Sequence, residues 1–423
     1  MRKNINKALS TPQASQLTRS AFLWTRILGT PFWGLISMLP FILYKDLHIT
    51  PLQITMLIAL KPMSSLLAPY WSQAIYQRPD QLISNLVWAN ILRYIPFLLL
   101  PFFDSIWLII LAFGIYMMLH RATVPAWMEI VKHHLPGTAR ERAVGHASTI
   151  EYIGTAVITL LFGFTLDHYE HIWRWLLPGM ALLGLASTWF LGKIPVPECS
   201  PKLPSPTRVP FNIQENIVKP WKHSLKLMRE RPDFARFQLG FMLGGAGLMI
   251  TQPALPTFFV DALHLSYLEM CLALTICKGI GVAVAAPLWT RLFSKIDIFH
   301  FSGLVTLLAA LFPLLLLMAP MHLSVLYFAY ILYGVMQAGS EMSWHMSGLT
   351  FSEDKESSAF SSTNVLMVGL RGCFIPALGA ALLSMSYSVT VMLCGVVLSL
   401  IASGQLIRYS RLLAAKATPA AQQ

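Results

Sequence analysis

The sequence predicts an all-α membrane protein with twelve transmembrane helices and both termini in the cytoplasm. Of its 423 residues, 55% are hydrophobic and only 12% are charged, whereas soluble domains carry about 25% charged residues. Twelve apolar runs are each long enough to cross a bilayer, which takes about 20 residues. Most Lys and Arg residues lie on one side of these runs. This composition excludes an ordinary soluble enzyme or a nucleic-acid-binding domain.

The first apolar run contains Arg26 and shows no small-residue cleavage site, so we interpret it as a retained helix and not as a signal peptide. The later runs are separated by short connections, except after the sixth. The predicted spans are residues 21–44, 52–76, 82–102, 105–130, 147–166, 173–193, 236–260, 267–290, 298–319, 322–349, 358–384 and 387–408.

The orientation follows from the positive residues, which are retained on the cytoplasmic side of a membrane. Of the 31 Lys and Arg residues, only Lys45 and Arg174 fall in segments predicted to lie outside. We therefore place both termini in the cytoplasm. The net charge of +12 is then a signal of topology, and it requires no nucleic-acid partner.

One long connection divides the chain into two halves. It begins rich in proline, and from Pro220 it is predicted to be helical, with Trp221, Leu225 and Met228 on one stripe. This helix is expected to lie on the inner membrane surface or to act as a solvated linker. The predicted parts are a tail (1–20), a six-helix bundle (21–193), the linker (194–235), a second six-helix bundle (236–409) and a tail (410–423).

Similar residues recur in the two halves at a nearly constant offset. His48 and His264 differ by 216 positions, and Trp127 and Trp344 differ by 217. Two six-helix repeats in the same orientation predict a pseudo-two-fold axis along the membrane normal, with a binding site between the halves. We expect Trp127 to superpose on Trp344.

This arrangement resembles the major facilitator superfamily. Residues 120–126, which read His-Arg-Ala-Thr-Val-Pro-Ala, resemble the helix-4 motif that centres on a buried arginine, and residues 369–379 resemble the Gly/Pro pattern of helix 11. In the loop between the second and third spans, only Arg78 survives from the family signature. The resemblance implies a secondary active transporter working by alternating access, with helices 1, 4, 7 and 10 around a central cavity.

Charged residues inside a bilayer are costly and indicate functional sites when they face a cavity. Among them, the resemblance selects Arg26, His120, Arg121 and Glu341. Polar and aromatic residues share a stripe with these at helical spacing. The predicted residues for substrate binding or coupling are Arg26, Thr30, Trp33, Tyr116, His120, Arg121, Glu151, Gln252, Tyr333, Gln337 and Glu341.

Other intramembrane charges are predicted to be structural. We expect Arg93 and Arg371 to pair with carbonyl groups or an acid, and we interpret Lys61 and Lys278 as locks between helices, with ligand contact as the alternative. Arg121 is expected to interact with Glu341 or Glu151, because an unpaired guanidinium would cost several kcal/mol at mid-membrane.

Basic residues outnumber acidic ones within the spans, which predicts an anionic or acidic polar substrate. A drug-type exporter of lipophilic or cationic compounds is the alternative. A membrane-embedded transferase and a non-transporting receptor remain possible in other classes.

No P-loop or hydrolase motif occurs, so we expect no enzyme, no cofactor and no metal. The expected partners are a small solute, membrane lipids and a co-transported proton or other ion. We expect a monomer in the bacterial inner membrane.

Overall fold

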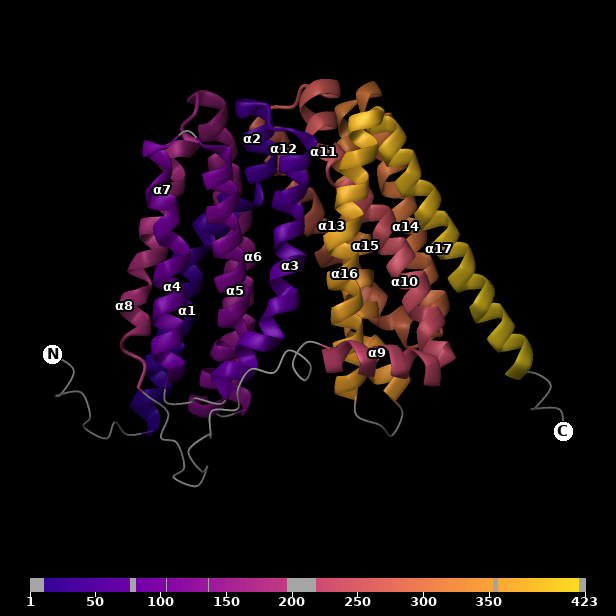
Figure 1. Cartoon of the computed structure of the whole chain (residues 1–423), viewed down its shortest axis with the longest axis horizontal. Helices are drawn as coiled ribbons and strands as arrows, with labels where there is room; N and C mark the ends of the chain where they lie inside the picture. The colour runs from indigo at the N-terminus through magenta and orange to yellow at the C-terminus, as the bar shows by residue number, and fades with distance from the viewer. Residues whose placement is uncertain are drawn as a thin grey trace. The chain divides into compact units, whose positions relative to one another are not determined.

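The computed structural model consists of helices joined by short turns (Figure 1). The residues that it describes are 11–76, 81–103, 105–135, 137–195, 218–352 and 357–417. Within them, eight helices are long and apolar enough to cross a membrane, and two bent pairs raise this number to ten at most. The protein is thus an integral, multi-pass membrane protein.

Two of the predicted spans are not among these ten. Residues 52–76 correspond to α3 (Pro51–Tyr76), and residues 173–193 correspond to α7 (Trp173–Ala186) followed by α8 (Thr188–Leu191). Both regions are helical, but twelve spans stay a prediction. The Pro-rich part of the linker (196–217) and Arg78 lie outside the described residues, as do residues 1–10 and 418–423 of the two predicted tails.

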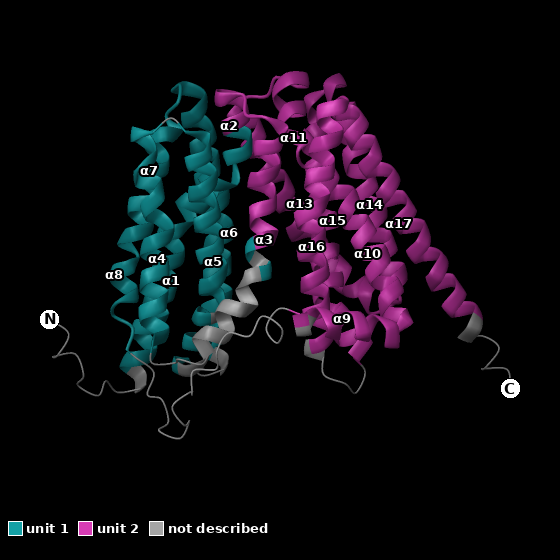
Figure 2. Cartoon of the chain, in the orientation of Figure 1, with its two compact units in different colours: residues 1–42, 64–210 teal, residues 43–63, 211–423 magenta. Residues whose placement is uncertain are grey.

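The chain forms two compact units, which Figure 2 distinguishes by colour. Unit 1 comprises residues 1–42 and 64–210, and unit 2 comprises residues 43–63 and 211–423. Residues 43–63 therefore group with the second unit, although the sequence assigns them to the first bundle.

Close contacts with α16 (Ser357–Met385) explain this difference. A Cβ atom on Gly372 would lie only 2.4 Å from Cβ of Pro62, so glycine permits the approach of α16 to α3. The hydroxyl of Thr55 donates to the carbonyl of Pro376 at 3.4 Å, beside its bond to Pro51. A domain boundary placed from sequence composition takes no account of such a contact between distant segments.

In unit 1, α1 (Thr11–Ser37) packs against α6 (Gly137–His168) and α7, and α4 (Leu82–Leu98) packs against α5 (Ile106–His134) and α7. Small residues allow the close approach of α1 to α6: a Cβ atom on Gly34 would lie 2.9 Å from Oγ1 of Thr159. A short helix, η2 (Leu100–Phe102), follows α4.

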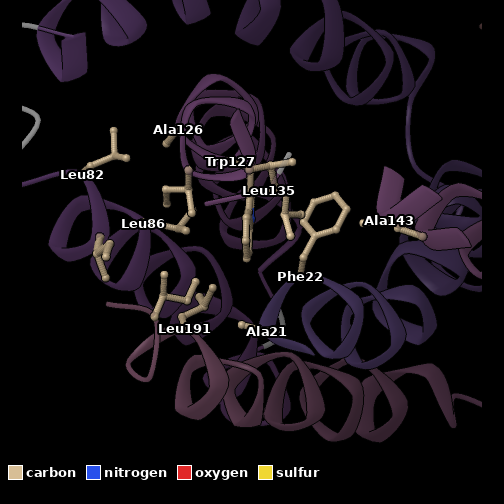
Figure 3. Close-up of a cluster of buried hydrophobic side chains, with 14 residues drawn as sticks. Ala21, Phe22, Leu82, Leu86, Ala126, Trp127, Leu135, Ala143 and Leu191 are labelled. Carbon is tan, nitrogen blue, oxygen red and sulfur yellow. The ribbon is translucent and has the colours of Figure 1, made fainter. Parts of the chain in front are cut away.

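A buried apolar cluster holds these helices of unit 1 together (Figure 3). Phe22 of α1 meets Trp127 of α5 edge to face, with ring centroids 5.1 Å apart. Leu86 of α4 and Leu191 of α8 complete the contact from the other side. Edge-to-face aromatic pairs add about 0.5–1.5 kcal/mol to the effect of burial.

Unit 2 is the larger unit, and one of its helices is bent. α10 and the segment from α11 to η4 form a pair bent by 41° at a break, where Pro253 interrupts the helix. The helices of unit 2 are α9 (Lys219–Glu230), α10 (Pro232–Thr251), α11 (Ala254–Thr257), η4 (Phe258–Ala262), α12 (Tyr267–Cys271), η5 (Leu272–Cys277), α13 (Lys278–Phe293), α14 (Ile298–Met318), η6 (Ala319–Met321), α15 (Leu323–Ser352), α16 and α17 (Ser388–Ala417). α2 (Leu39–Leu47) continues from unit 1 into unit 2.

Polar contacts fix the ends of several helices in unit 2. Asp297 caps α14 by accepting hydrogen bonds from the backbone N–H groups of Phe299 and His300. Its second oxygen accepts from the hydroxyl of Ser410 at 2.6 Å, which ties α17 to α14. At α12, Ser266 and Glu269 form a reciprocal capping box, so Glu269 has a structural role.

Two tyrosine–aspartate hydrogen bonds connect α2 with the chain around α12. The hydroxyl of Tyr44 donates to Asp261 at 2.5 Å, and the hydroxyl of Tyr267 donates to Asp46. The ammonium group of Lys45 donates to the carbonyl of Leu265 and lies 4.2 Å from the centroid of the Tyr267 ring. Together these contacts hold α2 at the end of unit 2 that is opposite to α9 (Figure 1).

Replacing both Tyr44 and Tyr267 by Phe is expected to loosen α2. Hydrogen bonds to charged groups contribute about 1.5–3 kcal/mol each, so local opening of α2 should become more frequent. Hydrogen–deuterium exchange of peptides from α2 and α12 should accelerate at least tenfold. Tyr387→Phe is the control because Tyr387 is 82% exposed; equal exchange in the double variant and this control would contradict the prediction.

The amphipathic helix α9 is present, but its buried face differs from the predicted stripe. Ser224 and Leu227 are buried, whereas Leu225 is 49% exposed. The hydroxyl of Thr363 donates to Ser224 at 3.0 Å, and Leu227 packs in an aromatic cluster with Phe234. Contact with α10 and α16 therefore decides the orientation of α9.

Two local features agree with the predicted repeat. His48 and His264 both adopt a left-handed backbone conformation, with φ of 49° and 51°, where their helical segments turn. Trp127 packs on Phe22 in unit 1, and Trp344 packs on Phe241 in unit 2. Superposition of the two halves stays a prediction.

Candidate functional site

Unit 1 contains a cavity with about 470 Å³ of empty space, including the space at its open mouth. α1, α4, α5 and α6 supply its walls. Polar and aromatic side chains dominate the lining, and Gly29 and Val124 are the exceptions. The lining residues are Thr25, Arg26, Gly29, Thr30, Trp33, Arg93, Tyr94, Tyr116, His120, Thr123, Val124, Trp127 and Glu151.

An ion pair crosses this cavity between α1 and α6. The guanidinium of Arg26 donates to the carboxylate of Glu151 at 2.7 Å. Their side chains remain 25% and 32% exposed, so both groups are accessible from the cavity. The Arg26 guanidinium also lies 5.5 Å from the centroid of the Phe22 ring. One positive and one negative charge therefore neutralise each other within reach of a solute.

The aromatic wall is a cluster of three rings in mutual contact. The ring centroid of His120 lies 5.0 Å from that of Trp33 and 5.7 Å from that of Tyr116, and the centroids of Trp33 and Tyr116 lie 6.4 Å apart. Tyr116 in turn contacts Tyr94 and Phe32, which are fully buried. Burial of Tyr94 and Phe32 holds the cluster in place, so the cavity presents aromatic surface beside charged groups.

Arg93 supplies the second guanidinium of the cavity. It donates to Oδ1 of Asn90 at 2.5 Å and to the hydroxyl of Tyr94 at 3.2 Å, and it lies 3.4 Å from Nδ1 of His120. Asn90 is itself held by Ser187 and Thr188, which accept from its amide group at 3.1 and 2.8 Å. A chain of polar contacts thus runs from the break between α7 and α8 to the cavity.

Gly184 makes room for this wall. A Cβ atom at position 184 would lie 2.3 Å from the Tyr94 ring, and no ring atom can yield by that amount while Phe32 and Tyr116 hold the opposite side. The absence of a side chain on α7 therefore places Tyr94 in the cavity.

Gly184→Ala is expected to displace Tyr94 and to disturb the cavity. Overpacking of this kind costs about 1–3 kcal/mol, so thermal stability in detergent should fall and solute binding should weaken several-fold. Gly179→Ala on the same helix is the matched control, since nothing lies within 4 Å of a Cβ atom there. Equal stability of the two variants would contradict the expectation.

The structure brings six of the predicted residues into this cavity. They come from three separate segments: Arg26, Thr30, Trp33, Tyr116, His120 and Glu151.

Arg121 does not line the cavity, although it stands next to His120 in the sequence. Successive residues of a helix point about 100° apart, so Arg121 leaves the stripe of Tyr116, His120 and Trp127. The predicted interaction of Arg121 with Glu341 or Glu151 stays a prediction, and the carboxylate of Glu151 binds Arg26. Nε of Arg121 has no hydrogen-bond partner among the described residues.

The other predicted residues lie in unit 2. The amide group of Gln337 donates to Glu341 at 3.0 Å on α15, and Glu341 interacts electrostatically with Lys278. Tyr333 packs against Phe312, with ring centroids 4.7 Å apart. Gln252 lies at the break after α10, where its backbone N–H donates to the carbonyl of Met249.

Arg371 contacts a backbone carbonyl, as we expected of a structural residue. Its guanidinium donates to the carbonyl of Phe241 at 3.1 Å and lies against the backbone at Gly245, where a Cβ atom would be 1.8 Å away. The absence of a side chain on Gly245 permits this position of the guanidinium across α10.

The sequence missed Arg93 as a cavity residue, together with its neighbours Asn90 and Tyr94. The signal was present: Asn90, Arg93, Tyr94 and Phe97 follow helical spacing and are all buried in α4. The superfamily resemblance selects helices 1, 4, 7 and 10, whereas α4 is the third predicted span.

Comparison with known proteins decides the family. A model of the Major Facilitator Superfamily matches residues 21–376. The chain belongs to the major facilitator superfamily. This membership makes it a transport protein and not an enzyme. Among curated protein sequences, none matches this chain.

Solved structures of the superfamily share the fold at low sequence identity. A POT family transporter in complex with 5-aminolevulinic acid matches with a TM-score of 0.69 and 13% identity, covering 94% of this chain and 96% of that one. The nucleoside transporter NupG matches with a TM-score of 0.67 and 13% identity, covering 92% and 99%. A bacterial homologue of the human lysosomal transporter Spinster matches with a TM-score of 0.62 and 12% identity, covering 93% and 98%.

Proposed function

We propose that the protein is a secondary active transporter that binds a small polar solute with an acidic group in the cavity of unit 1. The observation that carries the proposal is the lining itself. Two guanidinium groups, a carboxylate and a cluster of aromatic rings face one space in a membrane-embedded bundle. Guanidinium groups bind carboxylates and phosphates through paired donors, and flat rings pack against planar solutes.

The transport cycle follows from the superfamily plan. Twelve helices in two parallel repeats, with both termini in the cytoplasm, would rock around the solute to give alternating access. The sequence has no ATP-binding motif, so the proposed energy source is an ion gradient or the gradient of the solute. We place the protein in the bacterial inner membrane, as a monomer surrounded by lipids.

The proposed coupling group is the Arg26–Glu151 pair. A carboxylate within a membrane takes up a proton more readily once its cationic partner is removed. The negative charge of an acidic solute in the cavity would compete with Glu151 for Arg26, and the released carboxylate would then accept a proton. Solute and proton would thereby share one site and move together.

Uptake by purified protein in proteoliposomes tests this proposal. The panel contains small carboxylates, nucleosides, dipeptides and lipophilic cations, each measured with and without an inward proton gradient. Accumulation of an acidic solute above the protein-free control supports the proposal. Exclusive transport of cations or neutral lipophiles would favour a drug-type exporter, and failure of the whole panel would favour a receptor without flux.

A further inference from the structure

Arg93 differs from the other charged residues of the cavity in its surroundings. It lies in the middle of α4, is 6% exposed, and still lines the cavity. Its contacts are Asn90, Tyr94 and His120, and its guanidinium lies 4.7 and 5.7 Å from the ring centroids of Tyr94 and Tyr116. Each of these groups is an uncharged acceptor or an aromatic face.

Within the described residues, Glu151 is the carboxylate that lines the cavity, and it is not a partner of Arg93. Glu151 forms its ion pair with Arg26, so the positive charge of Arg93 is left without an anion. Nε of Arg93 is buried and has no hydrogen-bond partner in the part of the chain that the structure describes. A buried cation is costly unless an anion compensates it, and the cavity gives a solute access to this position.

The hydrogen bonds around Arg93 also fix which atoms of His120 and Asn90 act as acceptors. A guanidinium only donates, so Nδ1 of His120 is the acceptor of the 3.4 Å contact with Arg93. The amide nitrogen of Asn90 donates to Ser187 and Thr188, which turns its oxygen toward Arg93. Arg93 is therefore held in place by groups that accept its hydrogen bonds.

We infer that Arg93 is the residue that selects the charge of the solute, and that the solute enters the cavity as a monoanion whose oxyanion pairs with Arg93. This inference rests on the proposed transport function. Arg93 is the arginine that selects the charge of the solute, because Arg26 already pairs with Glu151 and Arg121 does not line the cavity. Asn90 is a positioning residue that orients the guanidinium.

Asn90→Asp gives the sharpest test. The substitution barely changes side-chain volume, but it places a carboxylate beside the Arg93 guanidinium and neutralises it in place. The probes are flat ring acids and their amides: nicotinate with nicotinamide, and benzoate with benzamide. We expect wild-type protein in proteoliposomes to prefer each acid to its amide. In Asn90→Asp this preference should fall at least tenfold.

Two controls separate charge from folding. Asn364→Asp introduces the same change at another asparagine that is 1% exposed, in unit 2 and beyond the lining of the cavity, and it should keep the preference for acids. Arg93→Lys retains the positive charge and should retain part of the preference, whereas Arg93→Gln should lose it. Fluorescence-detected size-exclusion chromatography establishes which variants are folded. If Asn90→Asp is not folded, Arg93→Gln replaces it as the test variant.

The outcomes distinguish this inference from the proposed function. An unchanged acid-to-amide ratio in both Asn90→Asp and Arg93→Gln, with active transport of acids, would overturn the role of Arg93 and leave the transport function intact. A wild type that prefers amides would overturn the monoanion class. A wild type that transports neither these probes nor any solute of the broader panel would overturn both.

Discussion

Glu151→Gln is expected to abolish proton-driven accumulation of solute while preserving exchange of solute across the membrane. The substitution keeps the shape of the side chain but removes its charge, so the residue can no longer bind and release a proton. Accumulation should fall by about tenfold or more, whereas counterflow of labelled solute should continue. Thermal stability should change by no more than about 1 kcal/mol, because the pair with Arg26 is partly exposed and such pairs contribute little.

Glu170→Gln serves as the control, since Glu170 is an exposed residue in the turn that follows α6. The two variants are compared in the same liposomes, with and without a proton gradient. If Glu151→Gln accumulated solute as well as this control, the pair of Glu151 with Arg26 would be a structural contact and coupling would lie elsewhere.

Gly281→Ala is expected to destabilise unit 2 strongly. A Cβ atom at position 281 would lie 2.0 Å from the carbonyl oxygen of Ile331, and one at Gly334 would lie 2.0 Å from the carbonyl oxygen of Lys278. These two glycines face each other's helices, α13 and α15, so the backbones themselves would have to separate. Overpacking in a well-packed interior costs about 1–3 kcal/mol, and clashes between backbones cost more.

Gly279→Ala is the matched control on the same helix, because nothing lies within 4 Å of a Cβ atom there. It should be neutral or slightly stabilising, since alanine favours a helix by about 1 kcal/mol over glycine. Scanning fluorimetry in detergent compares the two melting temperatures, and expression yield gives a second measure. Equal melting temperatures would show that α13 and α15 pack less closely than the structure places them.

Much of the candidate cavity could be predicted from helical spacing. Arg26, Thr30 and Trp33 lie on one stripe of α1, and Tyr116 and His120 lie on one stripe of α5, and all five line the cavity. Lipid cannot satisfy polar side chains, so a polar stripe on a membrane helix has to face protein or water. That requirement acts on the sequence directly, and it needs no knowledge of the neighbouring helices.

Other residues could not be assigned in this way. Arg93 and Arg121 are both arginines near the middle of apolar helices, yet only Arg93 lines the cavity. The choice depends on the rotation of α4 and α5 about their axes, which contacts such as Gly184 with Tyr94 determine. In the same way, the partner of Glu151 was decided by the approach of α1 to α6 at Gly34 and Gly154.

The sequence by itself determined that this protein crosses a membrane several times, that it belongs with the transporters of the major facilitator superfamily, and which faces of α1 and α5 are polar. These properties are local, because hydropathy and the helical period act within one segment. Only the tertiary structure decided that residues 43–63 pack with unit 2, that Arg26 pairs with Glu151, and that Arg93 has no anionic partner among the described residues. Those outcomes arise from close packing between helices far apart in the chain, where a single glycine, which has no side chain, determines which groups come into contact.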